Sequence, residues 1–277
     1  MAIGRTDYSE DLVAAARSVL LEVTRLLGEY RDDIVIIGGW VPELLLSGGP
    51  MKHVGSTDVD LALNHQALAE PRYKTILDLL QSRGYAQSSE QPFIFKRTIP
   101  LPDRAITVQV DLLAGEYEGT GRSRRHQRIQ DVKARKVRGC DLAFGMSTEV
   151  TIHGILPGGA EDSATIRVAS IVPFIVMKGM AMHDRLKEKD AWDIYFCVTN
   201  YPEGLDALVK EFQPHMDKGL VREGLEKIAS KFASVNQVGP THVVDFEKVD
   251  DRDERARIQR DAFEKVNYLL GKLGIVG

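Results

Sequence analysis

The stretch from Gly55 to Leu63, Gly-Ser-Thr-Asp-Val-Asp-Leu-Ala-Leu, constrains the fold of this chain more than any other. It alternates like a β-strand, in which side chains two positions apart project from the same face. Asp58 and Asp60 therefore point together, and Val59 faces the other way. Neighbouring carboxylates repel each other unless a positive charge lies between them, and a divalent cation with oxygen ligands commonly supplies it. A solvent-facing strand with two ordinary acids is the alternative.

The bulk composition is that of an ordinary globular protein. The 277 residues carry a net charge of −4, so any contact with nucleic acid must come from a local patch. The N-terminus is polar and acidic, and the sequence has no apolar run of about 18 residues. We therefore expect a cytoplasmic protein that does not enter a membrane. Cys140 and Cys197 have no metal-ligand partner nearby in sequence and are expected to be free thiols.

The chain up to residue 169 reads as a mixture of helices and strands. Apolar residues recur at helical spacing over residues 9–30, 40–46 and 68–84. Strands are predicted at residues 34–37, 58–63, 93–95, 106–113, 145–157 and 164–169. The strand at 106–113 alternates most clearly, and it places Asp111 near its end on the polar face.

From residue 170 the pattern becomes helical. Helices are predicted over residues 170–198, 205–216, 220–235 and 251–273, with Pro202 and segment 236–240 as breaks. We therefore predict an α/β (α+β) protein in two domains. Residues 1–169 form the domain with a mixed sheet, and residues 170–277 form a helical domain.

Four features follow one another in an order that suits phosphoryl transfer. A strand ends in Gly38-Gly39 and opens a helix, the Asp-x-Asp strand follows, Asp111 ends a later strand, and a helix then carries lysines, an arginine and aspartates. Glycines let a backbone approach phosphates. Three carboxylates on neighbouring strands can hold two divalent ions, of which one orients a triphosphate and the other activates the attacking oxygen. Basic side chains on an adjacent helix would neutralise charge on the transferred group.

This order of motifs resembles the nucleotidyltransferase superfamily, the fold shared by DNA polymerase β and many small bacterial transferases. The family pattern is a strand ending in two small residues, then Asp-hydrophobic-Asp, then a lone acid; here it reads IIGGW, GSTDVDLAL and VQVDLL. The segment IVMKGMAMHDRLKEKDAWDIYF is similar to the helix signature of the AbiEii/AbiGii family of nucleotidyltransferase toxins. The signature falls on Lys178, Ala181, Arg185, Lys187, Asp190 and Asp193. Ser56, two residues before Asp58, fits that family as well.

The resemblance implies a nucleotidyltransferase fold whose helical domain completes the active-site cleft. It implies Mg²⁺ or Mn²⁺ as the cofactor, held by Asp58, Asp60 and Asp111, with a nucleoside triphosphate (NTP) as substrate. The catalytic residues are then expected to be Asp58, Asp60, Asp111, Lys178 and Asp193. The nucleotide-binding residues are expected to be Gly38, Gly39, Ser56, Arg185 and Lys189. If residues 170–198 form one helix, helical spacing aligns Lys178, Arg185, Lys189 and Asp193 in one stripe.

A separate cationic segment spans residues 122–138. Its basic residues are Arg122, Arg124, Arg125, Arg128, Lys133, Arg135, Lys136 and Arg138, against the single acid Asp131. Contact with a polyanion such as an RNA backbone is one interpretation, and a solvated loop and helix is the other. The segment contains no Phe, Trp or Tyr, so we expect phosphate contacts there and no base stacking.

The function predicted from these features is a metal-dependent nucleotidyltransferase that transfers a nucleoside monophosphate from an NTP to an acceptor. The resemblance implies RNA, such as tRNA, as the acceptor, a toxin role in a type IV-like toxin–antitoxin system, and an antitoxin protein as partner. Two alternatives stay open. One is an enzyme that modifies a small molecule such as an antibiotic, and the other is a non-catalytic module that binds a nucleotide or RNA. The presence of all three acids favours catalysis.

Overall fold

The computed structural model describes residues 4–49, 51–70, 74–116 and 125–275. The chain divides into two compact units, each considered by itself below. Residues 9–41 and 55–170 form the sheet unit, whereas residues 1–8, 42–54 and 171–277 form the helical unit. Two short pieces of the first 54 residues thus belong with the C-terminal helices. The division into domains at residue 169 stays a prediction.

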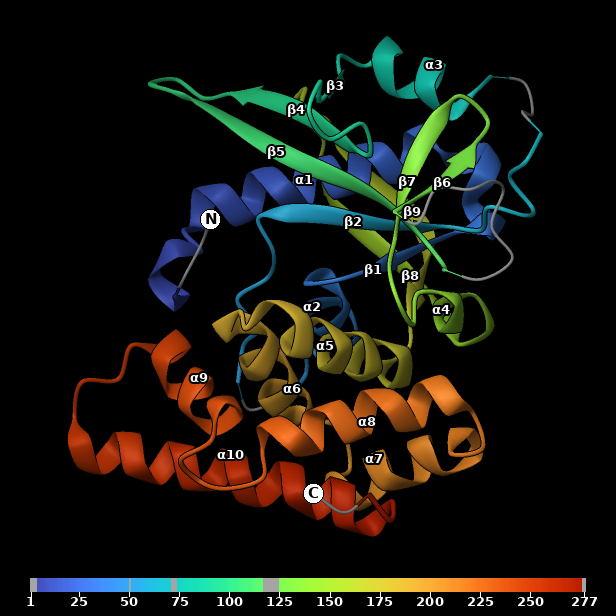
Figure 1. Ribbon diagram of the computed structural model, residues 1–277. Helices are drawn as coiled ribbons and strands as arrows, with labels where there is room; N and C mark the ends of the chain where they lie inside the picture. Colours follow the sequence, from blue (N-terminus) through green and yellow to red (C-terminus); the bar gives the residue numbers. More distant parts are fainter. Residues whose placement is uncertain (1–3, 50, 71–73, 117–124, 276–277) are drawn as a thin grey trace. The chain divides into compact units, whose positions relative to one another are not determined.

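A mixed sheet with the strand order β3-β4-β5-β2-β1-β9-β8 forms the sheet unit (Figure 1). The strands are β1 (Ile34–Ile37), β2 (Asp58–Leu63), β3 (Ala86–Gln87), β4 (Ile94–Pro100), β5 (Ala105–Ala114), β6 (His126–Ile129), β7 (Val132–Lys136), β8 (Ser147–Ile155) and β9 (Glu161–Ala169). Strands β2 and β5 pair in parallel, as do β1 and β9, while β1–β2, β4–β5 and β8–β9 pair antiparallel. This α/β architecture with a mixed sheet and a C-terminal helical region confirms the predicted fold class.

Helix α1 (Glu10–Leu26) packs on one face of the sheet, against β2, β5, β8 and β9. The shorter helices α3 (Ile76–Ser82) and α4 (Asp141–Gly145) also belong to this unit, and α2 (Trp40–Leu45) begins in it. The predicted helix at 68–84 is wrong at residues 68–70 and 74–75, which are not helical, and its residues 71–73 lie outside the described residues. Thr75 caps α3 by accepting a hydrogen bond from the Asp78 amide, which fixes the start of the helix at Ile76.

The apolar patterns of the strands behave as the sequence predicts. All four residues of β1 are buried. In β5, Val108 and Val110 are fully buried, whereas Thr107, whose side chain lies on the opposite face, is exposed. In β2, Val59 and Leu61 are buried, whereas the aspartates that alternate with them keep part of their surface in water. Alternation therefore sorts the core face of these strands from the polar face.

Six helices of the helical unit follow one another along the chain: α5 (Ile171–Arg185), α6 (Glu188–Asn200), α7 (Leu205–Phe212), α8 (Gly219–Lys231), α9 (Val238–Glu247) and α10 (Arg252–Lys272). The single helix predicted over 170–198 is wrong, because Leu186 adopts a left-handed conformation (φ +46°) that separates α5 from α6. The predicted break at 236–240 contains the start of α9. Pro240 lies in the first turn of that helix, where proline is tolerated.

Close packing of α5 against α8 depends on two glycines. A Cβ atom on Gly179 would lie 2.5 Å from the carbonyl oxygen of Gly224.

Both cysteines are free and buried. In the part of the chain that the structure describes, no helix is both long enough and apolar enough to cross a membrane.

Candidate functional site

The three predicted metal-binding acids lie together on two neighbouring strands of the sheet unit. The parallel pairing of β2 with β5 sets Asp60 opposite Asp111 and Asp58 opposite Gln109. Residues paired across neighbouring strands share a face, and the strands are about 4.8 Å apart. All three carboxylates therefore project from one face of the sheet. Asp58 and Asp60 are partly exposed, and Asp111 is buried.

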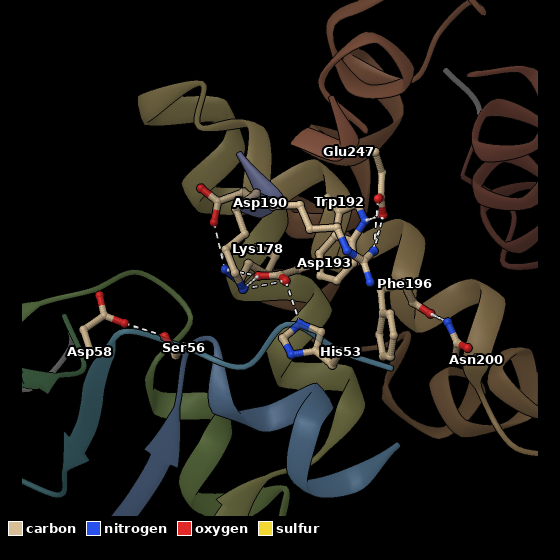
Figure 2. Close-up of polar contacts among 12 residues, drawn as sticks. His53, Ser56, Asp58, Lys178, Asp190, Trp192, Asp193, Phe196, Asn200 and Glu247 are labelled. Carbon is tan, nitrogen blue, oxygen red and sulfur yellow. Dashed lines mark hydrogen bonds and ion pairs between the residues drawn. The ribbon is translucent and has the colours of Figure 1, made fainter. Parts of the chain in front are cut away.

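Neutral polar groups hold two of these carboxylates and the start of β2. The Ser56 hydroxyl donates a hydrogen bond to Oδ1 of Asp58 over 2.5 Å (Figure 2). Gln109 donates from Nε2 to Oδ1 of Asp111 over 2.6 Å. The indole of Trp40 donates to the main-chain oxygen of Asp58 over 2.7 Å. The sequence analysis did not assign Gln109 a role, although its place on the polar face of β5, two residues before Asp111, was a usable signal.

Gly38 lies directly beside Asp60. It follows β1, whose last residue, Ile37, is paired with Asp60 across the antiparallel β1–β2 ladder. Its φ of +72° is in the left-handed region, and a Cβ atom added to it would lie 1.9 Å from Oδ2 of Asp60. Glycine is therefore required here for two reasons, and it leaves the backbone uncovered next to a carboxylate. Gly39 joins it to α2.

Replacing Gly38 with alanine is expected to lower the free energy of unfolding by about 1–2 kcal/mol, the cost of a left-handed alanine, and by more if Asp60 cannot move aside. Urea unfolding measures this. Gly28→Ala is the matched control, because a Cβ atom at Gly28 meets nothing within 4 Å. Equal stability of the Gly38→Ala variant and the wild type would contradict the close approach of Gly38 to Asp60.

The donor chemistry of the three acids suits a hard cation such as Mg²⁺ or Mn²⁺, which prefers carboxylate oxygens. Among the described residues, no group of three or more His, Cys, Asp or Glu side chains is arranged to hold a metal. Ser56 and Gln109 each donate a hydrogen bond to one oxygen of Asp58 and Asp111, respectively. A ligating carboxylate can keep such a hydrogen bond while it binds a cation, so both contacts are compatible with a metal at this site.

A buried ionic cluster in the helical unit contains the other predicted catalytic residues. The ammonium group of Lys178 lies 2.7 Å from Oδ2 of Asp193 and 2.8 Å from Oδ1 of Asp190 (Figure 2). Lys189 lies 2.8 Å from Oδ1 of Asp193. Both aspartates are fully buried. Lys178 comes from α5 and the others from α6, so the predicted stripe on one continuous helix is wrong, and packing of two helices brings these side chains together.

Arg185 closes the cluster on its exposed side. Its guanidinium group donates two hydrogen bonds to Asp190, of 2.7 and 2.8 Å, while its side chain stays 49% exposed. Asp190 therefore bridges Arg185 and Lys178. The sequence analysis did not place Asp190 in the site, although the residue falls on the toxin-family signature.

His53 is a further member of the cluster. Its Nε2 lies 3.0 Å from Oδ1 of Asp193, and its ring packs against Trp192 and Phe196. Burial and then the positive charge of Lys189 lower the pKa of His53 to about 4, against the opposing effect of Asp193. The histidine is therefore neutral at pH 7. His53 lies 140 residues from Asp193 in the chain, so this contact is seen only in the folded structure.

The aspartates of the cluster stay charged in spite of their burial. Burial alone would raise the pKa of Asp193, but Lys178 and Lys189 outweigh it and hold that pKa well below its usual range. The pKa of Asp190 is lowered to about 2, because Lys178 and Arg185 outweigh burial in the same way. With His53 neutral, three cations face two anions, and the cluster carries one net positive charge.

Stability is expected to depend on pH through His53. Its pKa is near 6.5 in the unfolded chain and about 4 in the folded chain, so the unfolded state binds more protons between these values. The free energy of unfolding should therefore fall by up to about 3 kcal/mol as the pH drops from 6.5 to 4. Urea titrations across this range measure the slope. His53→Gln should flatten it, while His183→Gln, at an exposed position, should not.

The structure describes the cationic segment from Arg125 onward, and Arg122 and Arg124 lie outside the described residues. The described part is a hairpin of β6 and β7, not a loop and helix, with Arg128 paired opposite Lys133. The fold also adds an aromatic ring that the segment itself lacks. The guanidinium of Arg135 lies over the ring of Phe93 with 5.4 Å between the guanidinium carbon and the ring centroid, and Phe93 packs against His126.

The remaining basic residues of the segment are placed less distinctively. Lys136 ends β7. Arg138 forms a 3.0 Å ion pair with Glu116. Arg128 and Lys133 are exposed on facing strands, which makes them candidates for contact with a polyanion.

No protein-family model matches the chain. No curated protein matches it. Two solved structures are similar at low identity: JHP933 from Helicobacter pylori and a protein from the same organism provisionally named as a nucleotidyltransferase. Each is 13% identical with a TM-score of 0.47 and covers 96% of this chain, over 94% and 97% of its own length respectively. At this level of similarity, function has to be argued from the site itself.

Proposed function

We propose that this protein is a metal-dependent nucleotidyltransferase that transfers a nucleoside monophosphate from an NTP to an acceptor hydroxyl. The main observation in favour is the parallel pairing of β2 with β5, which sets Asp111 beside Asp60 with Asp58 on the same face. The second is Gly38, whose uncovered backbone lies next to Asp60. Acidic side chains have no attraction for a triphosphate by themselves, so a cation between them is part of the proposal.

Asp58, Asp60 and Asp111 would hold the divalent cation. When bound, such an ion neutralises charge on the phosphates and orients them for in-line displacement. The acceptor oxygen forms a bond to the α-phosphorus, the bond from that phosphorus to the bridging oxygen breaks, and pyrophosphate leaves. Asp111 would accept the proton of the acceptor hydroxyl. Gly38 and Gly39 would let the backbone approach the phosphates, and Ser56 would orient Asp58.

The ionic cluster of the helical unit would supply positive charge. Lys178 and Lys189 are buried and bound to aspartates, so we assign them the positioning of the cluster together with Asp193. Arg185 keeps about half of its side chain in water and is the cation of this group best placed to meet a phosphate. A net positive charge on the cluster would favour an anionic ligand.

The test is incubation of the protein with each α-labelled NTP and Mg²⁺, once with total cellular RNA and once with a mixture of hydroxylated small molecules. We expect label in RNA and release of pyrophosphate with at least one NTP. Label in the small-molecule fraction alone would replace RNA with a small acceptor and leave the reaction type in place. Absence of pyrophosphate release with every NTP, Mg²⁺ and Mn²⁺ would contradict the proposal and favour a non-catalytic binding module.

RNA as the acceptor is supported by the cationic hairpin of β6 and β7. If Arg128 and Lys133 each contact a phosphate, replacing both with glutamine should reduce the slope of log K against log salt by about 2, because each contact contributes about 1. Filter binding of tRNA at several salt concentrations measures this. Arg83→Gln with Lys96→Gln, at exposed positions of the same unit, removes the same charge elsewhere and should leave the slope unchanged.

A toxin role with an antitoxin partner is the finer part of the proposal, and the resemblance of the α5–α6 segment to the AbiEii/AbiGii signature supports it. Modification of tRNA would stop translation, so expression of the active protein should arrest growth. The antitoxin would then be a protein that relieves the arrest.

A further inference from the structure

Strand β8 is the last strand in the order of the sheet, and among the described residues no further strand pairs with its outer edge. It pairs with β9 over an uninterrupted register from Ser147 to Ile155. At the two ends of this ladder, the amide of Ser170 donates to the carbonyl of Met146, and that of Leu156 donates to the carbonyl of Ala160. Even-numbered residues of β8 therefore face β9 with their amide and carbonyl groups, and odd-numbered residues turn these groups outward.

This edge lacks the usual protection against pairing. Natural sheet edges are commonly blocked by lysine, proline, a bulge or a very short strand. Residues 147–155 contain neither lysine nor proline, and the register with β9 has no bulge. The guanidinium of half-buried Arg17 reaches the outward carbonyl of His153 at 3.5 Å, the outer limit of a hydrogen bond, and another strand could displace it. The edge is therefore open to an added strand.

The sequence of β8 is complementary to itself in antiparallel alignment. When two copies are aligned about Thr151, Glu149 of each copy falls opposite His153 of the other, and Val150 falls opposite Ile152. The outward-facing residues 149, 151 and 153 are then those that exchange main-chain hydrogen bonds, as the parity of the strand requires. Acid thus meets imidazole on one face, and apolar side chains meet on the other, which are favourable cross-strand pairs.

Apolar surface at the end of β8 adds to this. Ile155 is 58% exposed, and in the same alignment it falls opposite Ser147 of the second copy. It also borders a cavity of about 410 Å³ whose apolar lining includes Ala14, Ile99, Leu101 and Leu156. A stable interface needs on the order of 1,000 Å² of buried surface, more than one strand edge alone provides. The apolar cavity beside Ile155 offers further surface for burial.

We propose that two copies of this chain associate about a twofold axis through antiparallel pairing of their β8 strands, which joins their sheets into one. The occupant of the edge is a second copy because the strand is complementary in charge and apolar pattern to itself. The pairing uses residues outside the acidic site of β2 and β5, and it does not depend on the proposed reaction.

Sedimentation of the full chain over a range of concentrations tests whether it dimerises. Variants that exchange the charges on β8 test whether the dimer forms through this strand. The wild type should form dimers. His153→Glu alone places two glutamates opposite each other, twice per dimer, and should raise the dissociation constant about tenfold, at roughly 0.7 kcal/mol a pair. Adding Glu149→Lys to it gives a double variant. The double variant restores opposite charges and should recover wild-type dimerisation. Glu90→Lys makes the same change at an exposed position between β3 and β4, at the other end of the strand order, and should have no effect.

Recovery in the double variant separates this pairing from a folding defect and from association through another surface. Hydrogen exchange adds a local readout, since the amides of Glu149, Thr151 and His153 should be protected in the dimer and exchange rapidly in the monomer. A wild type that stays monomeric at all concentrations overturns the proposal and leaves the edge to an extended segment of another protein. A dimer that is indifferent to the charge exchange overturns it too.

Discussion

Asp58→Asn should reduce nucleotidyl transfer at least about a thousandfold, because a metal ligand supplies several kcal/mol of transition-state stabilisation. The fold should survive the change. Asparagine keeps an oxygen that can accept the hydrogen bond from Ser56, and it removes one of three like charges from the same sheet face. We expect a melting temperature equal to or above that of the wild type. Transfer of labelled nucleotide and thermal unfolding, measured on the same preparation, check both parts.

Asp103→Asn is the control for Asp58→Asn, since it removes a carboxylate from an exposed loop of the same unit. It should leave transfer unchanged. Growth of cells that express each variant adds a second readout: arrest by the wild type and by Asp103→Asn, with normal growth for Asp58→Asn, would support the toxin role. Transfer by Asp58→Asn at the wild-type rate would show that this acid holds no catalytic metal.

Asp193→Asn should destabilise the protein by about 3–5 kcal/mol, the cost of removing one partner from a buried ion pair. The carboxylate is fully buried and pairs with Lys178 and Lys189, so its loss removes one of the two anions of the cluster and leaves Asp190 to balance three cations. This is a large share of a typical stability of 5–15 kcal/mol. Denaturant unfolding measures the loss. Asp217→Asn, at an exposed position, should change stability by less than about 0.5 kcal/mol.

The same variant should lose part of the acid sensitivity of the wild type. Asp193 has a lowered pKa in the folded chain, so its stabilising effect is complete above the pKa of an unfolded aspartate, near 3.9, and is lost as the pH falls through the folded value. Wild-type stability should therefore decline below about pH 4 with a contribution that Asp193→Asn lacks. A variant as stable as the wild type at pH 7 would mean that water or another group compensates both lysines.

Local patterns were enough to predict the strands that carry the acids. Alternation in β2 and β5 fixed which side chains share a face, and the glycine pair after Ile37 marked the end of β1. The pairing of Asp60 with Asp111 joins residues 51 positions apart, and only the resemblance to a known fold suggested it. Their role as metal ligands stays a prediction.

The misjudged elements share a physical cause. Leu186, between α5 and α6, is in the left-handed conformation, and leucine is not a residue that indicates a turn in a sequence. The two helices were therefore predicted as one. Conversely, Pro240 was read as a break, since proline usually ends a helix. It lies in the first turn of α9, where proline is tolerated, and the sequence did not show that the helix begins at Val238. His53 and Asp193 are 140 residues apart, and their contact follows from packing that neither local sequence encodes.

The interleaving of the two units has a consequence for how the molecule is made. Residues 1–8 and 42–54 leave the ribosome early, yet the helices they belong with are synthesised last. Arg5 can pair with Glu247, and His53 with Asp193, only after the C-terminal part of the chain has been synthesised. Cutting the gene once near codon 170 would thus release a helical fragment that lacks the buried imidazole of His53 and the ion pair of Arg5 with Glu247, and a faithful separation of the halves would require relocating both early segments.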